Sequence, residues 1–443
     1  MIPKISIFAL NRSYRRHGPE FVARLQQQYG DLFYVRPPLP RIPQLYFILE
    51  AAETHQLLVR HRPMLEKPAL LRRTVESSFG NGLIVSQGDF WRRQRKLMQP
   101  AFHHAHLNQY TDRIVTHAQA MLATWQDDQV ITIDKAMHAL TFTIVMDALF
   151  SANATDTTAT VQQAMRDLTE GFAAQSRSIL LSLSPEWFPW PALNQKRRGA
   201  RALDGVVQQM IAARQNVGAS ERPLDLLSTL LFTQDEDTGE TMSHRQLRHE
   251  LVTLYIAGHE TTALLLNWTW VLLAQHPDIA AALRSELQTV LGGRPPTFDD
   301  LPALKLTKAI IQEVLRLYPP TWFMMREAAA NLTIRGEAIP TGSILVFVPY
   351  AVHRNNRWYD QPQTFQPSRW LNGLEQSLPK GAYFPFGLGP RVCIGNGFAL
   401  MEAQLILATI AQRFQLQQLN EAQTGPAILL GFAKPVQMRL NQP

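Results

Sequence analysis

The only cysteine in this 443-residue chain, Cys393, lies in the stretch FPFGLGPRVCIGNGFAL (384–400). A single thiol excludes an intrachain disulfide and a cysteine-based zinc site, so neither kind of cross-link holds this chain together. Apolar residues make up 46% of the chain and charged residues 18%, a balance that suits a globular protein with a large core. A lone cysteine also fits a reducing compartment, and we expect the protein in the cytoplasm.

The length and net charge of the chain limit how many domains and which kinds of partner it can have. The length predicts two or three domains by default, with a single elaborated enzyme domain as the main exception. The formal net charge of +7 is weak support for a polyanion, so no nucleic-acid partner is expected, and an acidic protein partner fits equally well. The apolar start MIPKISIFAL is too short to cross a bilayer and lacks a small-residue cleavage site. We therefore expect a soluble chain with no transmembrane segment.

Hydrophobic periodicity predicts a helix-rich chain with small sheets. Two short strands, DLFYVR (31–36) and QLYFILE (44–50), precede a mostly helical region from about 51 to 215. Helices are predicted from about 244 to 275 and over 276–292, where Pro277 and Gly292 mark the two ends. The stretch 331–350 reads as strand, turn and strand. The expected fold class is therefore mainly α with small β-sheets.

The residues around the thiol form the pattern Phe386-x-x-Gly389-x-Arg391-x-Cys393-x-Gly395. The glycines remove side chains that would keep a flat cofactor away from the loop. The guanidinium two residues before the cysteine can bind a carboxylate on the rim of that cofactor. A shielded thiolate is the iron ligand that pushes electron density into the metal and favours O–O cleavage. The alternative is an inert, buried cysteine.

This loop resembles the haem-binding loop of the cytochrome P450 family, the haem-thiolate monooxygenases. The resemblance implies haem b (iron protoporphyrin IX) as cofactor, with Cys393 as the metal ligand. It also implies the fold of that family, with haem between a long central helix and the cysteine loop. One domain would then span residues 1–443, with a β-rich part at about 30–50 and 330–350 and a helical remainder.

A second motif of this family is the Glu-x-x-Arg pair, which Glu313 and Arg316 match. Residues three apart share one face of a helix and can form an ion pair. In the family a second arginine joins the pair from a downstream loop, and Arg369 in FQPSRW matches it. The resemblance implies a buried structural network that supports the cysteine loop. The alternative is an ordinary surface pair.

The third motif is AGHETT (257–262), inside the predicted long helix. The resemblance places this segment over the haem iron, where Ala257 leaves room for dioxygen. It implies that Thr261 stabilises bound oxygen and that Glu260 relays protons, which makes these two the candidate catalytic residues. The alternative is a solvent-facing carboxylate and a core hydroxyl. His259 is expected on the helix surface.

Further cations match residues that bind the haem propionates in the family. Trp91 and Arg95 are four apart on one helix face. Arg326 matches a second propionate-binding position, and Arg391 supplies a third cation. His353 is expected to have a structural role.

The helix that carries Trp91 also contains a basic run, Arg92, Arg93, Arg95 and Lys96. This run is a candidate part of a docking face for an acidic redox partner. The alternative is a solvated helix face.

The resemblance implies insertion of one oxygen atom from O2 into a lipophilic substrate by hydroxylation or epoxidation. The candidate pocket residues are nearly all apolar, and the sequence does not decide between a fatty acid and a terpenoid. These residues come from three segments: Phe79, Leu83, Val85, Thr321, Phe323 and Leu430.

The chain shows no flavin or iron–sulfur motif, so we expect electrons from a separate ferredoxin and ferredoxin reductase that use NAD(P)H. Two other functions compete with this one. The first is a haem-thiolate enzyme that uses peroxide or isomerises its substrate, and the second is a non-enzymatic haem-binding sensor. The Glu260–Thr261 pair argues against both.

Overall fold

The computed structural model describes residues 2–37, 42–151, 155–178, 181, 184–185, 187–218, 225–235, 238–425 and 428–442. The chain divides into two compact units. The first unit comprises Met1–Pro68, Ile114–Thr141 and Glu260–Pro443. The second comprises Ala69–Arg113 and Phe142–His259. The cysteine loop belongs to the first unit.

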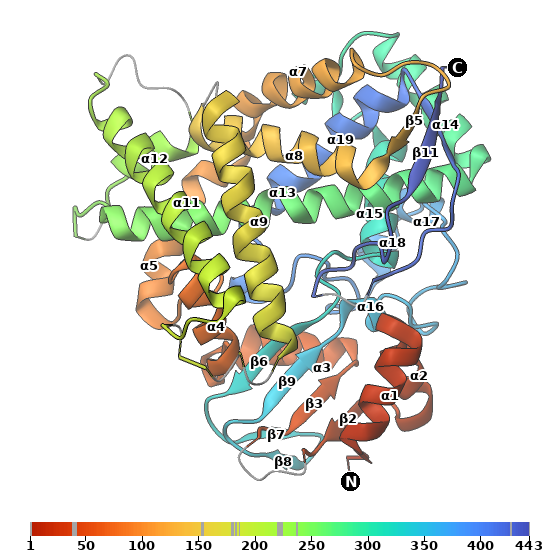
Figure 1. Cartoon of the computed structure of the whole chain (residues 1–443). Coiled ribbons are helices and arrows are strands. Elements are labelled where there is room, and N and C mark those ends of the chain that lie inside the picture. Colours follow the sequence, from red (N-terminus) through yellow and green to blue (C-terminus); the bar gives the residue numbers. More distant parts are fainter. Residues whose placement is uncertain are drawn as a thin grey trace. The chain divides into compact units, whose positions relative to one another are not determined.

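A six-stranded sheet in the first unit joins strands that are far apart in the sequence (Figure 1), in the order β1-β2-β3-β9-β6-β4. The strands β2 and β3 pair antiparallel, with Leu32 opposite Ile48, and β3 pairs parallel with β9. Both strands predicted near the N-terminus are therefore confirmed. The bounds are β1 Lys4–Ile5, β2 Leu32–Val35, β3 Leu45–Ile48, β4 Leu65–Glu66, β6 Met324–Ala328 and β9 Ile344–Phe347.

Two smaller sheets complete the β-structure of the described residues. A three-stranded antiparallel sheet has the order β10-β11-β5, and a two-stranded sheet pairs β7 with β8. The stretch 331–350 thus holds three strands rather than two, because Arg335 and Gly336, both with positive φ, turn the chain after β7. The bounds are β5 Val130–Thr132, β7 Leu332–Ile334, β8 Glu337–Ile339, β10 Gln415–Gln418 and β11 Gln437–Asn441.

Helices make up most of the remainder, so the predicted fold class is confirmed. In the first unit α1 and α2 lie beside the large sheet (Figure 1). The α-helices are α1 Ile7–His17, α2 Phe21–Tyr29, α3 Ala51–His55, α4 Ala69–Phe79, α5 Gly88–Met98, α6 His104–Leu107, α7 Thr111–Leu122, α8 Ile133–Phe150, α9 Thr155–Arg177, α11 Pro191–Gln215, α12 Leu226–Phe232, α13 His244–Gln275, α14 Pro277–Leu291, α15 Lys305–Leu317, α16 Pro349–Val352, α17 Ser368–Leu371, α18 Leu374–Ser377 and α19 Asn396–Ala411.

The predicted long helix is observed as α13, His244–Gln275, which runs as one continuous ribbon in Figure 1. The next helix, α14, begins at Pro277, whose fixed φ suits the first helical position, and ends at Gly292 in the left-handed conformation. Among the described residues, no helix is both long and apolar enough to cross a membrane.

Candidate active site

The cysteine loop is a tight turn that backbone contacts determine. The Cys393 N–H donates to the Phe386 carbonyl over 2.9 Å, which closes the loop in front of the thiol. Gly387 and Gly389 have φ angles of 79° and 68°. A Cβ on Gly389 would lie 2.5 Å from the Leu58 carbonyl oxygen. This glycine is therefore required by the fold itself, as well as by any flat cofactor beside the loop.

The Cys393 thiol lies just before the start of the buried helix α19. Cys393 is exposed, whereas α19, which begins three residues later, is buried from Met401 to Ala411. Gly395 accepts a hydrogen bond from the Ala399 N–H over 2.9 Å and so starts the helix. An exposed thiol just before a buried, apolar helix is available as a ligand, which an inert core cysteine would not be.

His353 anchors the start of the same loop. Its side chain is fully buried, and its Nε2 accepts the Phe384 N–H over 2.9 Å. Burial, with the neighbouring Arg316 and Arg354, lowers the pKa of His353 well below its usual value, so the ring stays neutral and can accept this bond. The geometry agrees with the structural role expected for His353.

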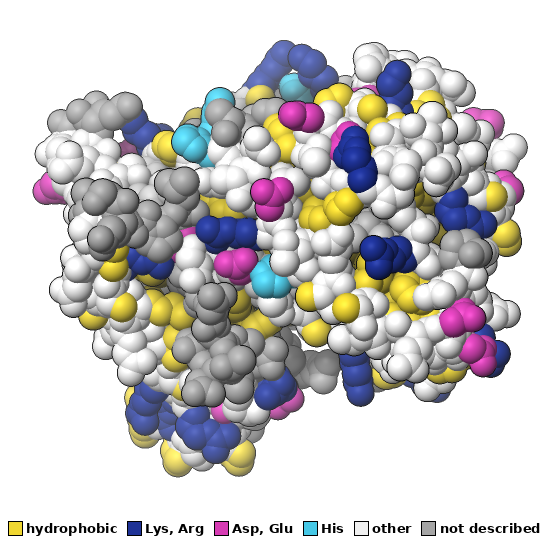
Figure 2. All heavy atoms as spheres, turned by 90° about the horizontal axis from the view of Figure 1, so that it is seen from above, with side chains coloured by type: hydrophobic (Ala, Val, Ile, Leu, Met, Phe, Trp, Pro, Cys, Tyr) yellow, Lys and Arg dark blue, Asp and Glu magenta, His cyan; other side chains and the backbone are white. Residues whose placement is uncertain are grey.

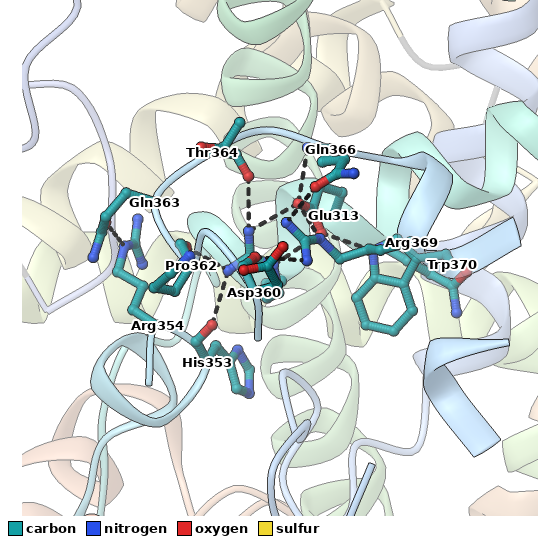
Figure 3. A network of polar contacts seen from close by, with 12 residues as sticks. Glu313, His353, Arg354, Asp360, Pro362, Gln363, Thr364, Gln366, Arg369 and Trp370 are labelled. Carbon is teal, nitrogen blue, oxygen red and sulfur yellow. Dashed lines mark hydrogen bonds and ion pairs between the residues drawn. The ribbon is translucent and has the colours of Figure 1, made fainter. Parts of the chain in front are cut away.

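The predicted Glu313–Arg316–Arg369 network is confirmed (Figure 3). Glu313 and Arg316 are fully buried on α15, and Arg316 donates to both carboxylate oxygens. The Arg369 Nε donates to Glu313 Oε1 over 3.0 Å. Arg316 also donates to the main-chain carbonyls of His353, Pro362 and Thr364. The network therefore ties α15 to His353 and to the segment 362–369 that follows it.

Trp370 is a member of this network that the sequence motif does not reveal. Its indole N–H donates to Glu313 Oε2 over 2.8 Å, and the Gln366 N–H donates to Oε1 over 3.0 Å. The carboxylate thus accepts bonds from five donor groups, which compensates for its removal from water. The sequence did not predict this role for Trp370, because a tryptophan after Arg369 is equally consistent with an ordinary core residue.

A cluster of three cations lies near the cysteine loop within the first unit. Lys67 follows β4, which pairs antiparallel with β6 so that Glu66 lies opposite Glu327. Lys67 directly follows the last pair of this ladder, and Arg326 directly precedes Glu327 on the partner strand. Desolvation, then Arg326 and Arg391, lower the pKa of Lys67 well below its usual value. Arg326 is 8% exposed, and burial lowers its pKa to about 10.

This cation cluster fits a cofactor that bears carboxylates. The positive charges of Arg326 and Arg391 disfavour a further positive charge on the Lys67 ammonium. Carboxylates placed among Lys67, Arg326 and Arg391 would relieve that repulsion. The cysteine loop supplies a thiol for iron, so the donor set fits haem, with a thiolate ligand and propionate-binding cations. Lys67 was missed because a lone lysine in a loop carries no motif.

The middle of α13 is more exposed than the residues directly before and after it. Residues 251–255 and 262–273 are buried, whereas residues 256–261, which include Ala257, Glu260 and Thr261, are partly exposed. Burial raises the pKa of Glu260 from its usual value. A carboxyl group with a raised pKa holds its proton nearer neutral pH and can donate it there. Glu260 and Thr261 are thus consecutive, partly exposed residues of this helix.

Two further titratable groups lie close to these residues. His259, expected on the helix surface, is partly buried: its Nδ1 lies 3.0 Å from the Tyr255 carbonyl and its ring packs edge-on against Phe142. That expectation holds in part, because the residue is partly exposed while Phe142 covers one side of its ring. On α19, burial raises the pKa of Glu402 to about 8, and the Thr262 hydroxyl opposes the shift.

Trp91 and Arg95 lie one turn apart on α5 in the second unit. Trp91 is 4% exposed and Arg95 is partly exposed. Their role towards a propionate stays a prediction.

Ion pairs neutralise part of the basic run on α5. Arg92 pairs with Asp89, and Arg93 pairs with Asp235 and Glu240. On the face shown in Figure 2, Lys and Arg side chains lie at several separate places, with Asp and Glu side chains among them. The run is therefore less positive than its sequence indicates.

The pocket candidates of the second unit lie in and after α4. Phe79 is 8% exposed and packs against Phe172, and Val85 is buried. The Leu83 N–H donates to Glu250 Oε2 over 2.8 Å, and burial raises the pKa of Glu250 to about 8. This bond attaches the loop after α4 to α13.

The pocket candidates of the first unit lie in two segments. Thr321 and Phe323 are partly exposed on either side of the buried Trp322, while Leu430 is fully buried. The Leu430 N–H donates to the Pro320 carbonyl over 2.9 Å, which joins the two segments. Their contact with a substrate stays a prediction.

Comparison with known proteins gives matches over almost the whole chain. A model of the cytochrome P450 family matches residues 4–436. Cyclooctat-9-en-7-ol 5-monooxygenase of Streptomyces melanosporofaciens is 34% identical over 91% of this chain and 86% of its own length. Pentalenene oxygenase of Streptomyces avermitilis is 36% identical over 93% of this chain and 90% of its own length.

Solved structures share the fold. The crystal structure of CYP175A1 from Thermus thermophillus aligns with a TM-score of 0.79 and 24% identity and covers all of both chains. That of a cytochrome P450 (CYP102L1) aligns with a TM-score of 0.82 and 23% identity, over 96% of this chain and 94% of that one.

Proposed function

Since the chain belongs to the cytochrome P450 family and is a haem-dependent monooxygenase, we propose that its substrate is a terpenoid, which it hydroxylates or epoxidises. The observation that carries this proposal is the pair of Streptomyces relatives, whose names refer to cyclooctat-9-en-7-ol and to pentalenene. The apolar character of Phe79, Leu83, Val85 and Phe323 supports a lipophilic substrate. A fatty acid is the second candidate, because the same apolar side chains would also suit an acyl chain.

The residues that would hold the cofactor are chiefly those of the cysteine loop and the cation cluster. Cys393 would supply the thiolate ligand, in the turn that Phe386, Gly389 and Gly395 form. The cation cluster Lys67, Arg326 and Arg391 would bind carboxylates, with Trp91 and Arg95 of α5 as further contacts. When bound, a thiolate-ligated haem uses two electrons and two protons to split O2 between the substrate and water.

Glu260 and Thr261 would supply the protons that this reaction consumes. The raised pKa of Glu260 keeps its carboxyl group partly protonated closer to neutral pH, where proton transfer to a neighbouring hydroxyl is easier. The Thr261 hydroxyl can both accept and donate a proton, so it can pass one onward without a net change in charge. Ala257, one turn earlier, has only a methyl side chain and would leave room for dioxygen.

A separate ferredoxin and ferredoxin reductase that use NAD(P)H would supply the electrons, and the protein would act in the cytoplasm. The chain has one cysteine and hence no second thiol for an intrachain disulfide, which supports a reducing compartment. The basic residues of α5 that stay partly exposed support an acidic partner, although Arg92 and Arg93 are already engaged in ion pairs.

The test uses the purified haem protein with pentalenene and dodecanoic acid as probes. Thiolate ligation is checked first by the absorption of the reduced carbon monoxide complex, with Cys393→Ser as the variant that should lose the thiolate spectrum. We expect pentalenene to shift the haem spectrum and to yield an oxygenated product with ferredoxin, reductase and NADPH. Conversion of dodecanoic acid alone would replace the terpenoid proposal by the fatty-acid one. Full activity with hydrogen peroxide and no reductase would overturn the proposed electron supply.

A further inference from the structure

Trp268 lies on the same helix as Thr261, seven residues further along, a spacing that returns to the same helix face. Its side chain is 2% exposed. Its indole N–H does not stay within the helix but donates to the main-chain carbonyl of Leu430 over 2.9 Å. A buried tryptophan N–H normally finds a partner, but this partner belongs to a turn 162 positions away.

Residues 428–432 form the segment that we call the Leu430 turn. Leu430 is not part of a strand, so no strand pairing supplies partners for its backbone N–H and carbonyl. Beside it, Phe432 forms a bridge with Thr424, and the Gly431 carbonyl accepts from the Gly425 N–H over 2.8 Å. Leu430 itself is fully buried, and its N–H donates to Pro320 while its carbonyl accepts from Trp268. Two other segments therefore satisfy both of its backbone groups, which fixes where the turn lies.

Ring contacts join the same three segments. The Trp268 ring stacks on Tyr318 with a centroid distance of 3.9 Å and an interplanar angle of 7°. Phe432 meets the indole edge-on at 4.7 Å. A Cβ on Gly431 would lie 3.1 Å from a methyl carbon of Leu264, one turn before Trp268 on α13. Tyr318 directly precedes the two prolines that lead to Thr321, so the Trp268 side chain contacts the Leu430 segment and the residue that leads into the other predicted pocket segment.

We propose that Trp268 is a positioning residue that holds the Leu430 turn and the 318–321 segment as one wall of the substrate site. This inference rests on the proposed function, because both segments carry pocket candidates only by prediction. The indole N–H is the essential group. Phenylalanine retains a flat ring for Tyr318 but leaves the buried Leu430 carbonyl without its donor.

Trp270 provides a matched control on the same helix. Its side chain is 3% exposed, and its indole N–H is buried without an acceptor among the residues that the structure describes. Trp268→Phe and Trp270→Phe therefore remove the same atoms from the same helix. They differ because the first removes a hydrogen bond to the turn and alters the ring contacts with Tyr318 and Phe432, whereas the second removes no hydrogen bond among the described residues.

The first experiment measures amide hydrogen exchange in the haem-loaded wild type and in both variants. Loss of a bond to a buried carbonyl changes a local opening equilibrium about tenfold. We expect peptides that cover 428–434 to exchange about tenfold faster in Trp268→Phe and at the wild-type rate in Trp270→Phe. Equal protection of the turn in both variants would overturn the proposed anchoring.

The second experiment titrates each haem protein with imidazole and with 4-phenylimidazole, whose phenyl group must fit between the walls of the site. We expect Trp268→Phe to change the ratio of the two dissociation constants severalfold, with the imidazole value and the carbon monoxide spectrum unchanged. An unchanged ratio in a variant whose turn exchanges faster would show that the turn is no wall of the site. Neither probe is a terpenoid, so a negative pentalenene result leaves this test intact.

Discussion

Arg316 and Glu313 form a bidentate ion pair in which the Arg316 Nε and Nη2 lie 2.9 and 2.8 Å from the two carboxylate oxygens. Both side chains are fully buried, so water does not reach the pair. Such a pair contributes little net stability by itself, because both charges lose their hydration. Removal of one partner is a different matter, since the other charge then stays buried without compensation. Here two guanidinium groups depend on one carboxylate.

We expect Glu313→Gln to lower the free energy of unfolding of the haem-loaded protein by about 3–5 kcal/mol, because Arg316 and Arg369 lose their counter-charge. Urea unfolding followed by circular dichroism measures this loss. The matched control is Asp89→Asn, which breaks the ion pair of Asp89 with Arg92 at the same spacing of three residues. Those side chains are 91% and 61% exposed, so the control should change stability by less than about 1 kcal/mol. Equal effects would show that burial does not decide the strength of this pair.

Lys67→Gln should have opposite effects on the protein with and without cofactor. Without haem, relief of the repulsion from Arg326 and Arg391 should stabilise the fold by about 0.5 kcal/mol. With haem, loss of a carboxylate-binding cation should speed haem release several-fold, as measured by transfer to apomyoglobin. Lys67→Arg keeps the charge and should retain haem. Lys308→Gln, an exposed lysine on α15, is the control and should change neither quantity. Unaltered haem release in Lys67→Gln would remove Lys67 from the binding site.

Glu402 predicts a pH dependence of stability whose sign follows from its raised pKa. The folded protein holds this proton up to about pH 8, whereas an unfolded chain releases it near the usual 4.5. Between these values the folded state binds more protons, so the free energy of unfolding falls as pH rises, by about 3 kcal/mol at pH 7. Glu402→Gln cannot ionise, so its advantage over wild type should grow between about pH 5 and pH 8.

The control for that experiment is Glu421→Gln, because Glu421 is an exposed carboxylate of the same unit. Its difference from wild type should not change with pH over this range. Parallel pH profiles for wild type and Glu402→Gln would contradict a neutral, buried Glu402.

Thr261→Ala should separate electron consumption from product formation. Without the hydroxyl, protons reach the oxygen less selectively, and more of the NADPH consumed should end as hydrogen peroxide. The fraction of NADPH recovered as product, measured with peroxide alongside, should fall several-fold while the carbon monoxide spectrum stays unchanged. Thr261→Ser restores a hydroxyl and should recover most of the coupling. Coupling at the wild-type level in Thr261→Ala would exclude Thr261 from proton delivery.

Motifs with a fixed spacing could be read directly from the chain. The positions of Glu313 and Arg316 on one helix face follow from a spacing of three residues, and α13 spans the predicted residues because its periodicity is uninterrupted. Arg369 required the family resemblance, since nothing local indicates that a residue 56 positions from Glu313 joins the same network.

The sequence by itself determined the mainly helical class, the thiol at Cys393 and the acid–alcohol pair on α13, because each depends on residue type and short-range spacing. Only the tertiary structure decided that Arg326 and Arg391 act on the charge of Lys67, that Trp370 donates to Glu313 and that Trp268 donates to the Leu430 turn. A contact between segments that are far apart in the sequence depends on how separate elements pack. No local sequence pattern shows which distant residue will be the partner. The same reason explains His259, whose ring is partly covered by Phe142 from another helix.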